Sequence, residues 1–87
     1  MTRDDLRDAV VEELARIAPE LDPKTIRSDA PLRDQVDFDS MDFLNFIIAL
    51  HYRLGVQILE SDYSKLSSVS ATVAYISTRL ADGKGTP

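Results

Sequence analysis

Ser40 is the residue whose type and position could support chemistry. It lies in residues 36–44, where a long loop is expected to meet a helix. Asp39 is a suitable N-cap and Asp42 stands three residues later, so the two residues predict a capping box. Ser40 is then the first helical residue, with an exposed hydroxyl beside free backbone N–H groups. Because a helix N-terminus carries a partial positive charge, this position suits a phosphate ester.

The acidic neighbours of Ser40 restrict what that phosphate can be. Asp39 and Asp42 add negative charge, which opposes a free phosphate ligand held by electrostatic attraction alone. The same carboxylates are compatible with a phosphate that another enzyme attaches covalently, because basic groups of that enzyme could recognise them. We therefore expect Ser40 to be modified by a separate enzyme, with Asp39 serving as helix cap and recognition residue.

Other chemistries for this stretch lack the residues that they need. A calcium-binding loop would require a closing glutamate where the sequence has Ile48. An Asp-x-Asp phosphotransferase nucleophile at residues 37–39 would require a preceding hydrophobic strand and a large α/β domain. His51 is the only histidine, and with no serine or acid clearly arranged around it an ordinary surface or half-buried histidine is expected. With no cysteine and no visible nucleophile–base pair, catalysis by this chain is not expected.

The helix that positions Ser40 is predicted over residues 40–54, and Gly55 is expected to end it as a C′ residue. Helical spacing separates a buried from an exposed side. The expected buried stripe with its flanking aromatic residues is Leu44, Ile47, Leu50, Leu54, Phe43 and Phe46. The expected exposed stripe is Met41, Asn45, Ile48 and Tyr52.

The remaining segments predict an all-α four-helix bundle with three longer helices, one short third helix and a long first loop. The first helix has Thr2 as N-cap and Asp5 in capping-box position, and Pro19 stops it. Residues 19–38 form the loop, with a helical turn around 23–27. An extended connector at 56–59 leads to a short helix over 61–66, and Ser68 caps the last helix. The apolar anchors expected in these segments are Leu6, Val10, Leu14, Ile17, Ile26, Leu32, Val36, Phe38, Tyr63, Leu66, Val69, Val73, Ile76 and Leu80.

The composition excludes several classes of protein. The 87 residues suffice for one small domain. The net charge is −5, from 15 acidic and 10 basic residues, and no basic stripe suggests nucleic-acid binding. A basic protein partner is favoured instead, because opposite fields steer encounter. No apolar run reaches membrane-spanning length, and the polar start of the chain is unlike a signal peptide. We expect cytoplasmic residence and no membrane partner.

Residues 36–44 resemble the phosphopantetheine attachment site of acyl carrier proteins. In that family a glycine, any residue and then Asp-Ser-Leu open the second helix. Asp39, Ser40 and Met41 match Asp-Ser-Leu, with methionine as a near-isosteric replacement. The resemblance continues without a gap over residues 34–76, and the first helix and proline-bearing loop match in kind.

The resemblance implies that Ser40 accepts 4′-phosphopantetheine from coenzyme A, transferred by a separate, magnesium-dependent phosphopantetheinyl transferase. The thiol of the arm would then carry acyl groups as thioesters to acyl-loading and acyl-processing enzymes. The family also docks partners through exposed residues of the second helix. With Asp39, the positions that correspond here are Met41, Asp42, Asn45 and Ile48.

Two features depart from the family pattern. Asp37 stands where the family usually has glycine, a residue that permits unusual backbone dihedral angles. In addition, no acid occurs between Phe43 and Leu59, whereas the second helix of fatty-acid members is markedly acidic. These departures predict a dedicated partner and a specialised pathway.

The sequence thus predicts a monomeric, non-catalytic acyl carrier domain over residues 1–80, followed by a flexible tail at 81–87. Its pathway is expected to make fatty acids, polyketides or related products. One alternative is a peptidyl or aminoacyl carrier, which usually has glycine and histidine before the serine, so Asp39 argues against it. Another is a helical protein-interaction module without a prosthetic group, in which Ser40 would be freely replaceable.

Overall fold

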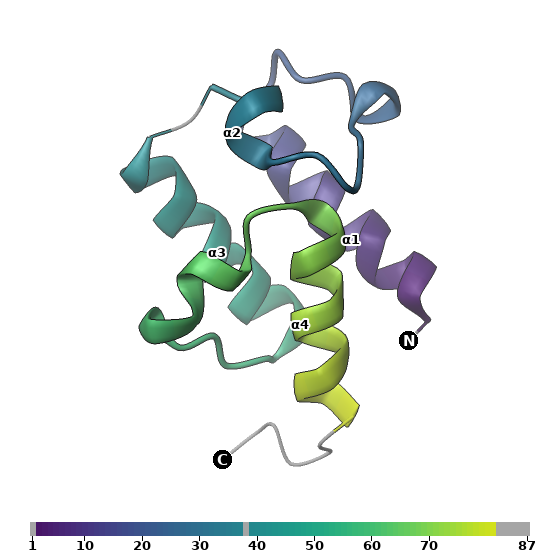
Figure 1. Cartoon of the computed structure of the whole chain (residues 1–87), viewed down its shortest axis with the longest axis vertical. Helices are drawn as coiled ribbons and strands as arrows, with labels where there is room; N and C mark the ends of the chain where they lie inside the picture. Colours follow the sequence, from purple (N-terminus) through teal and green to yellow (C-terminus); the bar gives the residue numbers. More distant parts are fainter. Residues whose placement is uncertain (1, 38, 82–87) are drawn as a thin grey trace.

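Helices supply all the regular structure in residues 2–37 and 39–81, which are the part of the chain that the computed structural model describes. Three long helices, α1, α3 and α4, pack together, and shorter segments connect them (Figure 1). The all-helical bundle is the fold class that the sequence predicts. The elements in chain order, with η for a 3-10 helix, are α1 (Arg3–Ile17), η1 (Pro23–Thr25), α2 (Leu32–Gln35), α3 (Ser40–Leu54), η2 (Glu60–Lys65) and α4 (Val69–Ala81).

Helix α1 begins at the capping box that the sequence predicts. The Thr2 hydroxyl accepts a hydrogen bond from the Asp5 backbone N–H at 3.1 Å, and the Asp5 carboxylate accepts one from the Thr2 N–H at 3.0 Å. These bonds satisfy N–H groups that have no partner within the helix. The hydrogen bond from the Thr2 backbone N–H, and secondly the interaction with the Thr2 side chain, lower the pKa of the Asp5 carboxyl. The apolar side of α1 faces α3 and α4 along its length, because its apolar residues recur at helical spacing.

The core lies where α1, α3 and α4 meet. Burial of apolar surface is the main favourable contribution to its stability. Phe46 and Leu50 of α3 are fully buried there, as are Leu66 after η2 and Ile76 of α4. The other buried apolar side chains in this core are Leu6, Val10, Val11, Leu14, Ile26, Leu32, Ile47, Val56, Val69 and Val73.

One expectation for the core side of α3 is wrong. Leu44 was expected in the buried stripe, but its side chain is 40% exposed, whereas Phe46 is 0% exposed and occupies the centre. Leu44 stands three residues before Ile47, and Phe46 stands four residues before Leu50, so each has helical spacing to one member of the buried stripe. Leu44 projects about 100° around the helix axis from Phe43, whose partly buried ring packs against the core, and therefore lies outside this stripe. The larger aromatic side chain takes the centre because it buries more apolar area.

The connection between α1 and α3 is more ordered than the sequence indicates. Its predicted turn is present as η1, but α2 was not predicted. Side chains and backbone fasten it to the rest of the molecule: Arg7 Nε donates to Ser28 Oγ at 2.9 Å, and Leu32 N donates to Ser67 O at 2.7 Å. The predicted anchors Ile26, Leu32 and Val36 are buried; Phe38, the fourth, lies outside the described residues.

The elements after α3 follow the predicted order. Gly55 ends α3 in the left-handed conformation, with φ of 66°, as expected for a C′ glycine. The connector at 56–59 is irregular, and η2 is a 3-10 helix over Glu60–Lys65. Ser68 Oγ caps α4 by accepting from Ala71 N at 3.0 Å.

The end of α4 differs in part from the expectation. The buried stripe of α4 ends at Ile76, because Leu80 is exposed near the helix end. Ala81 was placed in a flexible tail but is the last residue of α4, and the rest of that tail, 82–87, lies outside the described residues. None of the helices in the described ranges has the length and hydropathy needed to cross a membrane.

Candidate functional site

Ser40 is the first residue of α3 and its side chain is exposed. Asp39 precedes it in an extended conformation, which turns the chain from the loop into the helix. The Asp39 carboxylate accepts a hydrogen bond from Asp42 N at 2.9 Å, and the Asp42 carboxylate accepts one from Asp39 N at 3.3 Å. The predicted capping box is therefore present, and it holds the Ser40 hydroxyl toward solvent at the end of the helix where the dipole is positive.

The capping box also means that Asp39 and Asp42, the two acids beside Ser40, stabilise the start of α3. Asp39 is exposed and Asp42 is half-buried, and each carboxylate uses one oxygen on a backbone N–H group. Each retains a second oxygen for an approaching cation. The two acids can thus fix the helix start and still present negative charge beside the hydroxyl.

Asp37, which departs from the family pattern, requires no unusual backbone. Among the described residues, glycine alone has a positive φ, at Gly55. Asp37 therefore lies in a backbone region that any side chain can adopt. At position 37 itself, the conformational freedom of a glycine is therefore not needed.

A pocket of about 590 Å³ opens beside Ser40. It is bounded by α2, by the first turn of α3, and by η2 with the residues that follow it. Its lining residues are Leu32, Arg33, Asp39, Ser40, Phe43, Tyr63, Ser64, Leu66 and Ser67. Sequence reasoning found neither this pocket nor α2, because its walls come from segments that only the tertiary fold brings together.

One side of α3 exposes apolar side chains in a row that starts next to Ser40. Met41 is 64% exposed, Ile48 43% and Tyr52 80%, and Asn45 is also exposed, as the helical spacing predicts. Leu44 extends this row, which we call the α3 docking surface and define as Met41, Leu44, Asn45, Ile48 and Tyr52. The row begins one residue from the hydroxyl, so a protein bound there would lie over Ser40.

His51 is an exposed residue, as the sequence predicts, and it also makes a contact that the sequence did not indicate. Its Nδ1 lies 2.9 Å from the carbonyl oxygen of Val56, and because a carbonyl can only accept, Nδ1 carries the proton and donates it. Its ring packs edge-on against Tyr52 at 5.2 Å between centroids. His51 therefore fastens the end of α3 to the connector. Within the described residues, no cluster of three or more histidine or acidic side chains could hold a metal ion.

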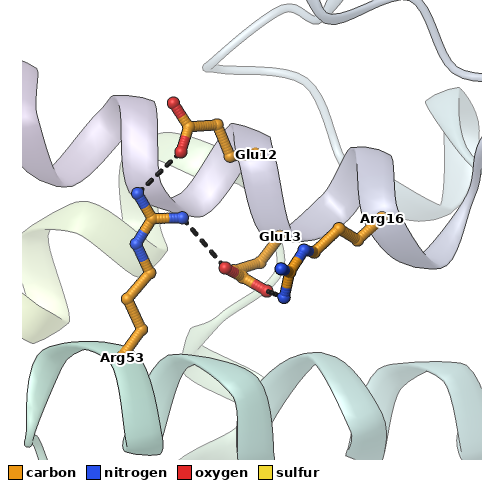
Figure 2. Close-up of polar contacts among 4 residues, drawn as sticks. All are labelled: Glu12, Glu13, Arg16 and Arg53. Carbon is orange, nitrogen blue, oxygen red and sulfur yellow. Dashed lines mark hydrogen bonds and ion pairs between the residues drawn. The ribbon is translucent and has the colours of Figure 1, made fainter.

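An ion-pair network holds the far end of α3 against α1 (Figure 2). Arg53 donates to Glu13 Oε2 at 2.9 Å and to Glu12 Oε1 at 2.6 Å. Arg16 approaches the other oxygen of Glu13 at 3.5 Å. The hydrogen bonds to Glu12 and Glu13 raise the pKa of Arg53. This network adds a polar contact between the last turn of α3 and α1 to the apolar packing of the two helices.

A second polar group fastens η2, one wall of the pocket, to α4. Tyr75 Oη donates to Asp62 Oδ2 at 2.6 Å, and Lys65 lies 3.2 Å from the other Asp62 oxygen. The hydrogen bond from Tyr75, and secondly the one from Lys65, lower the pKa of Asp62. Burial, and secondly the bond to Asp62, raise the pKa of Tyr75. The short η2, which buries none of its own residues, is thus held in place partly by charge.

Known proteins resemble this chain over most of its length. The family model described as the phosphopantetheine attachment site matches residues 4–76, which include Ser40 and the α3 docking surface. The chain is 32% identical over 73 residues to the acyl carrier proteins of Campylobacter curvus (strain 525.92) and Campylobacter concisus (strain 13826), covering 84% of this chain and 88% of each relative. It is 29% identical to the acyl carrier protein of Exiguobacterium sp. (strain ATCC BAA-1283 / AT1b), over 87% of this chain and 90% of the relative.

Proposed function

The chain belongs to the phosphopantetheine attachment site family of acyl carrier proteins, and we propose that Ser40 is the residue that bears its 4′-phosphopantetheine arm. The observation that carries the proposal is the position of Ser40 as an exposed first residue of a capped helix. The residues present fit such a group, since the hydroxyl faces solvent, the helix start favours an anion, and an open pocket adjoins it. The terminal thiol of the arm carries acyl groups as thioesters.

The modification requires Ser40 to act as a nucleophile toward coenzyme A on a separate transferase. The bond between Ser40 Oγ and the phosphorus of the pantetheine phosphate forms as the pyrophosphate bond of coenzyme A breaks. The serine proton passes to a base of the transferase, and adenosine 3′,5′-bisphosphate leaves. The free oxygens of Asp39 and Asp42 offer basic residues of that enzyme an electrostatic guide to the hydroxyl.

The α3 docking surface is proposed to contact the transferase and the enzymes that load or process the acyl group. Its apolar residues, with Asn45 among them, favour a partner with an apolar patch. Asp39 and Asp42 lie at its Ser40 end, so the matching patch would carry basic residues on that side. No acid occurs between Phe43 and Leu59, which favours a dedicated partner over one that reads an acidic helix.

We assign the chain a tethering role without catalysis of its own. Tethering raises the effective concentration of an acyl group at each partner's active site, and a mobile arm on an exposed serine is sufficient for it. The pathway is proposed to make fatty acids, polyketides or related products, with this protein acting as a monomer. The absence of cysteine fits the reducing cytoplasm as its compartment.

The test is intact-mass measurement after incubation with coenzyme A, magnesium and a broad-specificity phosphopantetheinyl transferase. The wild type should gain the mass of one phosphopantetheine group, and Ser40→Ala should gain none. Ser61→Ala, which removes another exposed serine hydroxyl, should be modified like the wild type.

The stability of Ser40→Ala separates loss of the nucleophile from loss of the fold. Because Ser40 is exposed, the free energy of unfolding of the Ser40→Ala protein should stay within about 0.5 kcal/mol of that of the wild type. Full modification of Ser40→Ala would place the arm elsewhere, and an unmodified wild type would contradict the proposed function.

A further inference from the structure

The pocket beside Ser40 is walled in part by packed apolar side chains. Leu32 and Leu66 form buried parts of its lining, with 3% and 0% of their surface exposed. The rings of Phe43 and Tyr63 meet edge to face, with 5.6 Å between centroids and 77° between planes. The hydrogen bond from Leu32 N to Ser67 O joins the α2 wall to the segment before α4. The pocket is therefore formed by packing of the fold, and its volume is in the range of small-molecule sites, about 300–1,000 Å³.

Arg33 is the cationic side chain in this lining. It belongs to α2, its side chain is exposed, and within the described ranges it forms neither an ion pair nor a side-chain hydrogen bond. The acid that shares the pocket, Asp39, accepts a backbone N–H instead. Among the residues that the structure describes, the Arg33 guanidinium thus has no partner, although Arg33 lines the same pocket as Ser40.

A phosphodiester on Ser40 would bring an anion to this pocket. Asp39 and Asp42 beside it repel that anion and offset part of the attraction of the helix start, so a nearby cation would stabilise the phosphate. A guanidinium suits this task because its planar fork can donate two parallel hydrogen bonds to two phosphate oxygens. Arg33 is the lining residue that supplies this chemistry.

We propose that Arg33 is a positioning residue for the prosthetic arm, an inference that rests on the proposed modification of Ser40. Its guanidinium pairs with the phosphodiester and directs the nearer part of the arm over the partly exposed rings of Phe43 and Tyr63 in the pocket lining. The arm thereby has a preferred resting direction, toward α2 and η2 and away from the α3 docking surface. A partner that binds the docking surface then meets an arm that lies along one side of it.

The experiment compares holo proteins by nuclear magnetic resonance. Arg33→Gln removes the charge, and Arg33→Lys keeps the charge without the fork. Arg27→Gln is the matched control, since Arg27 is an exposed residue of the same loop, lies outside the pocket lining, and uses only its backbone in the bonds to Gln35. The readouts are the ³¹P chemical shift of the phosphodiester and the ¹H–¹⁵N heteronuclear NOE of the arm's amides in protein loaded with labelled coenzyme A.

Arg33→Gln should shift the ³¹P resonance and lower the arm's NOE toward that of free pantetheine, while Arg27→Gln matches the wild type. The ³¹P shift and the NOE of Arg33→Lys should lie between those of the wild type and those of Arg33→Gln. Salt at about 1 M, where the Debye length is about 3 Å, should move the wild type toward Arg33→Gln and leave Arg33→Gln unchanged.

Two results would overturn the inference, and they are distinguishable. Intact mass confirms loading before each spectrum is recorded. A fully loaded Arg33→Gln protein with the wild-type shift and NOE would overturn the role of Arg33 and leave the modification of Ser40 standing. A wild type without mass gain would overturn the proposed function and this inference together.

Discussion

Arg53→Met should destabilise the protein by removing the ion-pair network between α1 and α3. The Glu13 side chain is only 5% exposed, so after this change a buried carboxylate loses its best donor. Methionine keeps most of the aliphatic packing of the arginine stem, which isolates the effect of the charge. The substituted residue lies about 20 Å from Ser40 along α3, so the two ends of the helix can be assayed separately.

The size of the loss in unfolding free energy follows from how exposed Glu12 and Glu13, the two partners of Arg53, are. The bond to Glu12, whose side chain is 61% exposed, contributes about 0.2–1 kcal/mol, as exposed ion pairs do. The hydrogen bond to buried Glu13 contributes about 1.5–3 kcal/mol, the range for bonds to charged groups. Arg16 remains at 3.5 Å from Glu13 and offsets part of the loss. We expect a total of about 2–3 kcal/mol, below the ~3–5 kcal/mol for a fully buried pair.

Urea unfolding followed by circular dichroism measures this difference. Glu12→Gln is the control for the exposed half of the network and should cost less than about 1 kcal/mol. Glu13→Gln, alone and combined with Arg53→Met, completes a double-mutant cycle, and the double variant should lose less than the sum of the singles. The folded Arg53→Met protein should still be modified at the wild-type rate. The reasoning is refuted if Arg53→Met costs no more than Glu12→Gln, since burial of Glu13 would then contribute nothing.

Two other perturbations test the wall of the pocket and the docking surface. Tyr75→Phe should raise the pKa of Asp62 toward its ordinary value, as seen in a ¹³C titration. In the wild type, the lowered pKa of Asp62 stabilises the fold at pH values above the ordinary carboxyl pKa, and this stability is lost as the pH falls through the folded pKa. Tyr75→Phe should make this pH-dependent stability smaller. An unmoved Asp62 titration would contradict the role of the hydrogen bond. Ile48→Asp should weaken binding to the transferase about tenfold, or about 1.4 kcal/mol, whereas Leu80→Asp on another exposed helix position should not. Equal losses in a binding titration of these two variants would argue against the docking surface.

The short-range features of the site were predictable from sequence. The capping boxes at Thr2 and Asp39 involve residues three apart, and their hydrogen bonds form wherever the chain begins a helix. The exposure of Ser40 follows from its place as the first helical residue. Gly55 likewise takes the left-handed conformation because it lacks a Cβ atom. Each of these depends on neighbours within one turn.

Features that depend on neighbouring elements were predicted less well. Spacing allowed either Leu44 or Phe46 in the core, and the choice required the surface of α1 and the shared core against which α3 packs. The exposure of Leu80 depends on how far along α4 the covering surface of α1 extends. The short α2 was missed because its first N–H is bonded to Ser67, a residue far along the chain, and the four residues alone show no helical periodicity.

The sequence by itself therefore determined the helix carrying Ser40, the acids that cap it and the family to which its motif points, because these depend on backbone hydrogen bonds and residue types within a single turn. Only the tertiary structure decided that Phe46 rather than Leu44 fills the core, and only it placed Arg33 on the same pocket as Ser40. The physical reason is that burial and pocket walls are set by the packing of elements distant in sequence, whose approach no local spacing encodes.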